Sequence, residues 1–415
     1  MKTIKVLILP IIEVICFSCG SDDDSGRQTQ KPKIIYILLI LELNELFSEK
    51  MLTIFILKHK LETLKHTVMM KLLNILTAIA ILIFMGSCSK DDDSGTPPVN
   101  DASLFGKWEI ISGRFVSEDD KYIEFNTDNT MHIFLENNNG FRNQIDGTIA
   151  TAETQIDINF GFGGATYEYE LGENTLTLSR SDGNLVELKV LETPEIISNW
   201  VIPIQILSEG ISPKNDYTDI AFNGTQLVVG NGYLPGNIDL VNPETFAVEG
   251  EIITSHNVTA VEIENYEFPG RYTFQSNGAD NTFYAYREDT NAFVFQSNPI
   301  TSYISGLASV DIYSIWVGSG ANGMLYLYNY DTQTIVRSIT INSSIKGLDY
   351  HGGYLYMTLG SYIYKCDVSS DFEIVETYKL PNTVIYGIAF DNTNFWVHAE
   401  TSDNIMKLIK TNLTL

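Results

Sequence analysis

Five related short phrases divide the C-terminal half of the chain into units of similar length, and this repeat restricts the possible folds more than any other feature. The phrases are DIAFNG, AVEIEN, GLASVD, GLDYHG and GIAFDN, and their matching apolar residues are Ile220, Val261, Leu307, Leu348 and Ile388. The steps between these residues are 41, 46, 41 and 40 positions. A period of this length accommodates four short strands with their turns. We therefore expect repeated four-stranded units over residues 194–415.

Further apolar segments follow most of the phrases after a turn. The second strand is expected at QLVVGNG, YSIWVGSG, GYLYMTLG and TNFWVHAE, and the third at segments such as GMLYLYNYDT. These units resemble the blades of β-propellers of the NHL, virginiamycin-lyase-like and glutamine-cyclotransferase-like group, which implies a propeller of about five blades. The last unit ends with its third strand, so we expect NWVIPIQI at residues 199–206 to supply the fourth strand and close the ring.

Residues 101–193 show a different pattern, in which apolar and polar residues alternate. TQIDINF and TYEYEL are examples, and turn signals such as NTDNT, NNNG, GFGG and SDGN separate about eight such segments. Eight short antiparallel strands close well into a small up-and-down barrel. The segment LFGKWEII, with Gly106 two residues before Trp108, resembles the lipocalin-like domain of Bacteroidota lipoproteins. The all-β chain is therefore expected to contain this barrel, with a filled interior, followed by the propeller.

The segment MKLLNILTAIAILIFMGSC at residues 70–88 has the form of a secretory signal, with a lysine and an apolar stretch too short to span a bilayer. The small residues before Cys88 resemble a bacterial lipobox, which implies cleavage before Cys88 and lipid attachment to its thiol. The following Lys90, Asp91, Asp92 and Asp93 resemble the surface-export signal of Bacteroidota lipoproteins; a solvated acidic spacer is the alternative. We expect a signal peptide at 69–87, a flexible tether at 88–100, and anchoring in the outer membrane, facing the cell exterior.

A second copy of the acidic phrase, SCGSDDDSG, occurs earlier in the chain at residues 18–26. Pro10 and Glu13 interrupt the apolar run before it, and no lysine precedes its acidic residues. We interpret residues 1–68 as a spurious N-terminal extension that contains a degenerate second lipoprotein signal, with translation beginning at Met69 or Met70. A functional membrane hairpin is the alternative.

The net charge argues against one class of partner, and the number of cysteines limits the possible disulfides and metal sites. The formal net charge of −26 argues against nucleic acid, because binding it requires a basic patch that releases counterions. Only Cys366 falls within the two expected domains, so neither an internal disulfide nor a cysteine zinc site is expected there. The sequence contains no P-loop, nucleophile-elbow or zinc-protease motif, and we expect no cofactor.

The candidate site residues lie in loops expected on one face of the propeller, near residues 230–236, 318–323, 360–362 and 399–403. These loops are rich in Gly, Asn and Ser, so a ligand can approach the backbone closely. His398 and Glu400 are the candidates for acid–base catalysis. The candidates for ligand contact are Trp396, His398, Trp316 and Tyr362. The abundant Tyr and Phe residues favour packing between blades, with a carbohydrate-stacking platform as the alternative.

Together these features predict a lipid-anchored cell-surface protein that binds a protein, peptide or glycan ligand through the propeller face. Two alternatives remain open at this point. The propeller is an enzyme, a lyase or glycosidase that acts on an extracellular polymer, or the barrel carries a small apolar ligand.

Overall fold

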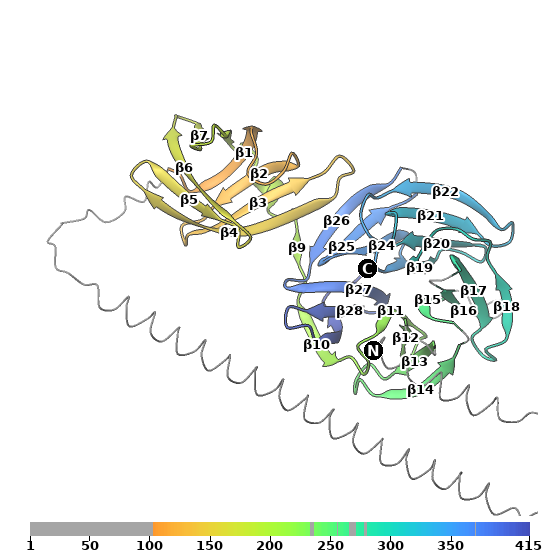
Figure 1. Ribbon diagram of the computed structural model, residues 1–415. Helices are drawn as coiled ribbons and strands as arrows, with labels where there is room; N and C mark the ends of the chain where they lie inside the picture. The colour runs from red at the N-terminus through yellow and green to blue at the C-terminus, as the bar shows by residue number, and fades with distance from the viewer. Residues whose placement is uncertain (1–102, 233–235, 255, 265–270, 278–279, 370) are drawn as a thin grey trace, which may run out of the picture. The chain divides into compact units, whose positions relative to one another are not determined.

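The structure is a computed structural model that describes residues 103–415, apart from residues 233–235, 255, 265–270, 278–279 and 370. It is an all-β protein with an eight-stranded closed barrel and a five-bladed propeller, as the sequence predicts (Figure 1). The expected N-terminal extension, signal peptide and tether, with Cys88, lie outside the described residues. Within the described part of the chain, no helix is long and apolar enough to cross a membrane.

The barrel is an antiparallel meander that closes where its first strand pairs with its last. Each strand begins close to a segment expected from the alternating pattern. The strands are β1 (Gly106–Ser112), β2 (Asp120–Phe125), β3 (Thr130–Glu136), β4 (Arg142–Ala152), β5 (Gln155–Asn159), β6 (Gly164–Leu171), β7 (Thr175–Ser179) and β8 (Leu185–Val190). Alternate residues point inward, so β5 follows the burial order exposed, buried, exposed, buried, exposed.

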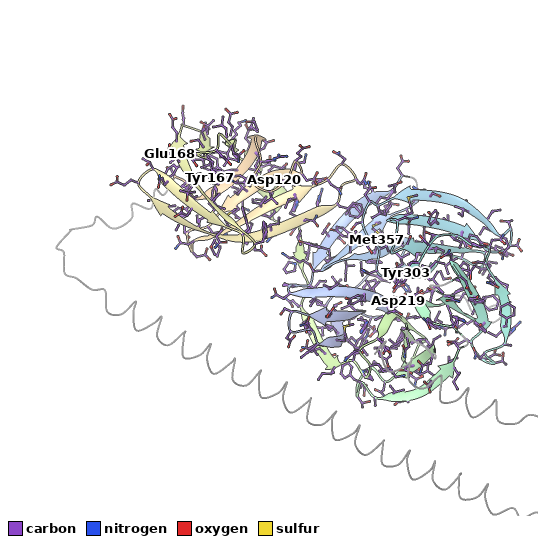
Figure 2. All side chains as sticks on the ribbon, viewed as in Figure 1. Asp120, Tyr167, Glu168, Asp219, Tyr303 and Met357 are labelled. Carbon is purple, nitrogen blue, oxygen red and sulfur yellow. The ribbon has the colours of Figure 1, made fainter. Side chains whose placement is uncertain are left out.

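Packed side chains occupy the barrel interior. Trp108 is buried, and its indole Nε1 donates a hydrogen bond to the Leu104 carbonyl oxygen at 3.1 Å. Phe125 and Tyr167 are also buried in this core, and Figure 2 shows Tyr167 among the barrel strands. Large inward-facing residues therefore fill the barrel, which does not favour the alternative of a carrier for a small apolar ligand.

The propeller consists of five antiparallel sheets, numbered here as blades in chain order. Blade 1 contains β11 (Tyr217–Phe222), β12 (Leu227–Asn231), β13 (Asn237–Val241) and β14 (Val248–Ile253). Blade 2 contains β15 (Val258–Ile263), β16 (Tyr272–Asn277), β17 (Thr282–Arg287) and β18 (Phe293–Gln296). Blade 3 contains β19 (Ile304–Ser309), β20 (Ser314–Ser319), β21 (Met324–Asn329) and β22 (Thr334–Thr340).

The last two blades incorporate the strands that precede blade 1 in the sequence. Blade 4 contains β23 (Leu348–His351), β24 (Tyr354–Leu359), β25 (Tyr362–Asp367) and β26 (Glu373–Lys379), with the two-residue β9 (Ile202–Pro203) added in parallel to β26. Blade 5 contains β27 (Thr383–Phe390), β28 (Phe395–Thr401), β29 (Met406–Thr411) and β10 (Ile206–Ile211). The five predicted phrases coincide with the first strand of each blade, which begins its sheet.

The ring closes with a strand from the N-terminal side, as expected, but the predicted segment 199–206 is wrong. Strand β10 pairs with β29 instead, with Glu209 opposite Ile409. This outer strand is largely exposed, so its position does not require an apolar sequence. The more apolar segment before it is buried elsewhere: Trp200 packs against Phe134, and its Nε1 donates to the Leu135 carbonyl oxygen at 3.2 Å.

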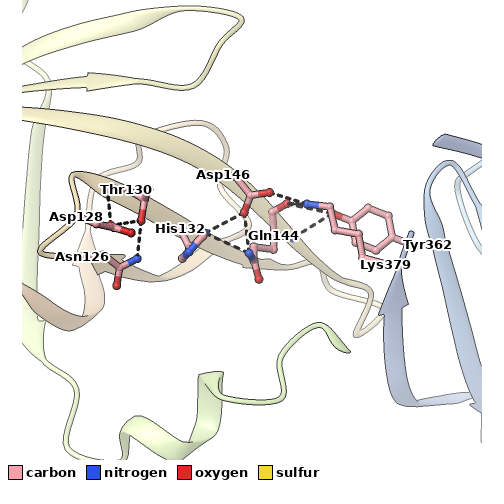
Figure 3. A network of polar contacts seen from close by, with 8 residues as sticks. All are labelled: Asn126, Asp128, Thr130, His132, Gln144, Asp146, Tyr362 and Lys379. Carbon is pink, nitrogen blue, oxygen red and sulfur yellow. Dashed lines mark hydrogen bonds and ion pairs between the residues drawn. The ribbon is translucent and has the colours of Figure 1, made fainter. Parts of the chain in front are cut away.

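One barrel strand and the turn before it make contacts with blade 4. The Phe141 ring packs edge-on against Tyr364, with 4.9 Å between ring centroids. The Tyr362 hydroxyl donates to the Gln144 carbonyl oxygen at 3.0 Å, and Lys379 Nζ lies 3.0 Å from an Asp146 carboxylate oxygen (Figure 3). These contacts combine an apolar side chain with a polar network on β4.

Candidate functional site

Five equivalent positions, four on the inner strands and one just before β23, surround a cavity at one end of the propeller channel. Each lies two residues before the matching apolar residue of its repeat. They are Thr218, Thr259, Ser305, Lys346 and Tyr386, and we call them the channel ring. All five line a cavity of about 730 Å³. This volume lies in the range of sites for small molecules.

Three members of the channel ring connect neighbouring blades. Thr218 Oγ1 donates a hydrogen bond to the Val258 carbonyl oxygen at 2.6 Å. Thr259 likewise donates to the Ile304 carbonyl oxygen on β19 at 2.7 Å, and Ser305 donates at 2.6 Å to that of Ile345, which lies just before β23. Since these hydroxyl protons are used inside the protein, the three positions stabilise the ring of blades rather than offering donors to a ligand.

The other two members, Lys346 and Tyr386, break this pattern. Tyr386 donates its hydroxyl proton to a Glu400 carboxylate oxygen at 2.9 Å. Lys346 Nζ lies 5.7 Å from the centroid of the Tyr386 ring. Within the described part of the chain, the ammonium group forms no ion pair. Lys346 and Glu400 therefore do not pair with each other among the described residues, and each instead lies against Tyr386.

Further groups extend the cavity wall. The Tyr303 side chain lies at the wall with 43% of its surface exposed, and its backbone φ of +59° is uncommon for an aromatic residue. Figure 2 shows Tyr303 and Asp219 near the middle of the propeller. The Asn257 side-chain oxygen is buried and has no hydrogen-bond donor among the described residues. The remaining lining residues are Asn215, Asp216, Tyr217, Gly232, Asn404 and Met406.

The structure separates the two residues that the sequence proposed as an acid–base pair. Glu400 lines the cavity, whereas His398 is fully buried, with its ring 5.8 Å from that of Tyr217 and 6.2 Å from that of Tyr386. Burial lowers the pKa of His398 to about 3, so its imidazole is neutral at physiological pH. His398 is not among the cavity-lining residues and so does not meet a ligand there.

The proposed aromatic contacts also lie elsewhere. Trp316 and Trp396 are buried in the apolar cores between blades. Tyr362, on β25, bonds to Gln144 of the barrel. Cys366 is fully buried, and burial raises the pKa of its thiol.

Sequence reasoning missed Lys346, Tyr386 and Tyr303. A signal for the first two was present in the repeat itself. When the five phrases are aligned, the position before the small or acidic residue reads Thr, Thr, Ser, Lys and Tyr. Two large side chains at a position otherwise held by small hydroxyl residues mark the place where the repeat departs from a purely structural pattern.

A second group of polar residues occupies the inner strands beyond the cavity. Asp219 is fully buried, and its Oδ2 accepts a hydrogen bond from the Val261 backbone N–H at 3.3 Å. Glu262 Oε1 similarly accepts from the Ser309 N–H at 3.0 Å. Burial raises the pKa of both carboxyls well above the ordinary range. Among the described residues, no group of three or more His, Cys, Asp or Glu side chains is arranged to hold a metal ion.

Comparisons with known proteins identify no family. The chain matches no protein-family model, and no curated protein sequence matches it. The solved structure of a glutaminyl cyclase from Myxococcus xanthus is similar over 51% of this chain and 97% of that chain, with 13% identity and a TM-score of 0.41. A structure of the mitotic checkpoint complex is similar over 78% of this chain and 97% of that chain, with 11% identity and a TM-score of 0.33. At these scores neither likeness bears on function.

Proposed function

We propose that the chain is a lipid-anchored cell-surface binding protein whose propeller cavity receives the ligand. The single observation that carries this proposal is the composition of the channel ring. Three of its positions are engaged in contacts between blades, while Lys346 is held in the cavity without an ion pair in the described part of the chain. An ammonium group that can still form an ion pair, in a cavity of this size, is a feature expected of a ligand site.

Binding without catalysis agrees best with the groups that line the cavity. General acid–base chemistry requires a titratable group within hydrogen-bond reach of the reacting atom. His398 is fully buried below the wall, and Glu400 already accepts a hydrogen bond from the Tyr386 hydroxyl. The His398–Glu400 pair that the sequence suggests for a lyase or glycosidase is therefore not assembled in the cavity wall.

The role of the cavity in ligand binding is tested by a substitution that fills its rim. Asn215 is an exposed lining residue, so Asn215→Trp fills space while leaving the channel ring intact. The full chain in detergent is applied to glycan and peptide arrays, with Asn174→Trp in an exposed barrel turn as the control. We expect Asn215→Trp to abolish the binding that the wild type and the control share. Equal binding by both variants, or turnover of any offered polymer, would contradict the proposal.

The anchor is tested at Cys88, which follows the signal-like segment. We expect Cys88→Ala to abolish metabolic labelling with a fatty acid, because the thiol is the attachment point in the lipobox that this segment resembles. Cys19→Ala, in the degenerate first copy, is the matched control and should leave labelling unchanged. Labelling that persists in Cys88→Ala but disappears in Cys19→Ala would move the anchor and the start of the mature chain.

A further inference from the structure

We propose that the ligand of the propeller cavity is an acidic sugar, bound through a single carboxylate by Lys346. This inference rests on the proposed function and specifies the chemical class of its ligand. It follows from the groups in the cavity wall that the protein itself leaves unpaired.

The charge requirement comes from Lys346. A half-buried ammonium group is ordinarily paired with a carboxylate, as Lys214 is with Asp239 at 2.7 Å on blade 1. Lys346 has no such partner among the described residues and lies instead toward the Tyr386 ring. A ligand carboxylate would supply a charge-assisted hydrogen bond that the free protein lacks.

The hydroxyl requirement comes from acceptors in the same wall. The buried side-chain oxygen of Asn257 has no donor among the described residues. Glu400 uses one oxygen to accept from Tyr386, and its other oxygen has no partner in the described part of the chain. A buried acceptor without a donor is costly, so the ligand is expected to bring an O–H donor to the Asn257 oxygen, and the Glu400 oxygen at the same wall can accept a second one. A sugar carries several such hydroxyl groups.

The aromatic residues add a surface for a sugar ring. Tyr303 presents a partly exposed ring and Tyr386 a half-buried one, and both line the cavity. A ring-shaped ligand with apolar C–H faces and hydroxyl edges matches a wall that contains both aromatic rings and amide and carboxylate oxygens.

The charge of the ligand is limited to about one. Asp216 and Glu400 line the cavity together with Lys346, and the whole chain carries a formal net charge of −26. A sulfated or phosphorylated polymer would face repulsion from these carboxylates along its length. One carboxylate directed at one lysine avoids this repulsion, which favours a uronic-type residue over a polyanion.

The test compares three ligands that differ only at the carboxylate. The probes are disaccharides with one terminal hexuronic acid, their methyl esters, and the corresponding neutral disaccharides. Affinity is measured by calorimetry with the full chain in detergent. We expect the free acids to bind about 10- to 100-fold more tightly than either uncharged form, the range of a hydrogen bond to a charged group.

Variants then assign the effect to Lys346. We expect Lys346→Met to remove the preference for the free acid, and Lys346→Arg to retain it because the charge is kept. Lys407→Met is the matched control, since Lys407 pairs with Glu209 on the outer strands of blade 5. Urea midpoints of all variants show whether each remains folded.

The outcomes separate the two proposals. Equal affinity for the acid, ester and neutral sugar, or unchanged acid binding by Lys346→Met, overturns the inference, as does tighter binding of a polysulfated chain. In those cases the proposed function stands if Asn215→Trp still blocks a bound ligand. If Asn215→Trp blocks nothing, the cavity is not the binding site and both proposals fail.

Discussion

At the scale of single residues, the propeller buries carboxyl groups on its innermost strands. Asp219 and Glu262 each accept one backbone N–H from the next blade. Glu264 accepts from the Tyr330 hydroxyl at 3.2 Å, and burial raises its pKa to about 7. Such groups are easier to bury as neutral acids than as anions. The neutral forms therefore stabilise the fold, and ionisation opposes it.

The pH dependence of stability follows from these shifts. A carboxyl whose pKa is raised in the folded state contributes stability below its ordinary pKa and loses it as pH rises through the folded value. Between pH 6.5 and 8.5, Glu264 passes through this range. His398 is neutral in the folded state but partly protonated in the unfolded state near pH 6.5, so it opposes this trend by only about 0.4 kcal/mol. We expect the free energy of unfolding to fall by about 1–3 kcal/mol over this interval, measured from urea midpoints.

Variants identify the groups responsible for this pH dependence. Glu264→Gln should reduce the slope because the amide does not ionise, and Asp219→Asn should act in the same direction. Burial lowers the pKa of His351, but the charge and hydrogen bond of Asp349 together outweigh burial and raise it, so His351 adds to the same trend. Glu118→Gln, an exposed barrel carboxylate, is the control. Stability that is constant or rises from pH 6.5 to 8.5 would contradict this account.

At the scale of elements, the first strands of blades 4, 5 and 1 approach one another closely at glycine. A Cβ atom on Gly387 would lie 2.7 Å from the Ile220 backbone nitrogen and 2.7 Å from Asp219 Oδ1. A Cβ on Gly347 would lie 2.8 Å from the Gly387 Cα atom. Because the Ile220 nitrogen and the Gly387 Cα are backbone atoms, rotating the Asp219 side chain alone cannot relieve these contacts.

We predict that Gly387→Ala destabilises the propeller by about 1–3 kcal/mol, the usual cost of overpacking. Urea unfolding followed by tryptophan fluorescence measures the change. Gly163→Ala is the matched control, since a Cβ there would meet nothing within 4 Å, and surface changes of this kind stay within about 0.5 kcal/mol. Equal stability of the two variants would show that the inner strands separate at little cost.

At the scale of the whole molecule, Phe141 connects two domains that fold around different cores. It follows β3 of the barrel, yet only 3% of its surface is exposed because it packs with Tyr364 and Phe372 of blade 4. Removing a buried aromatic ring costs about 3–5 kcal/mol. We expect the loss to weaken the contact between the two domains rather than the barrel core. Phe141 belongs to the core cluster of blades 3 and 4 and not to that of the barrel.

We therefore expect Phe141→Ala to separate the thermal unfolding of the barrel from that of the propeller in scanning calorimetry. The control is Phe162→Ala in a barrel turn, because 70% of the Phe162 surface is exposed. A calorimetric trace for Phe141→Ala that matches both the wild type and the control would mean that the contact contributes nothing to coupling.

Much of this architecture was predictable because it depends on local patterns. Alternation of apolar and polar residues placed the barrel strands, and the spacing of Ile220, Val261, Leu307, Leu348 and Ile388 placed the first strand of each blade. The closing strand was not predictable in this way, because β10 is an exposed edge whose apolar residues do not mark a buried face. Lys346 was missed because the absence of an ion pair, in the part of the chain that the structure describes, is visible only once the neighbouring blades are in place. The lipid anchor at Cys88 stays a prediction.

By itself the sequence determined the all-β class, the eight-stranded barrel and the five-bladed repeat, because pairing within each unit depends on side-chain period and on turns. Only the tertiary structure decided which residues share the cavity. Ring closure brings together five positions that are about 40 residues apart in the chain, and it places Glu400 beside Tyr386 while burying His398 beneath them. The spacing of residues along the chain predicts neither the set of residues that shares the cavity nor the different positions of Glu400 and His398. Both depend on how the blades converge around the channel.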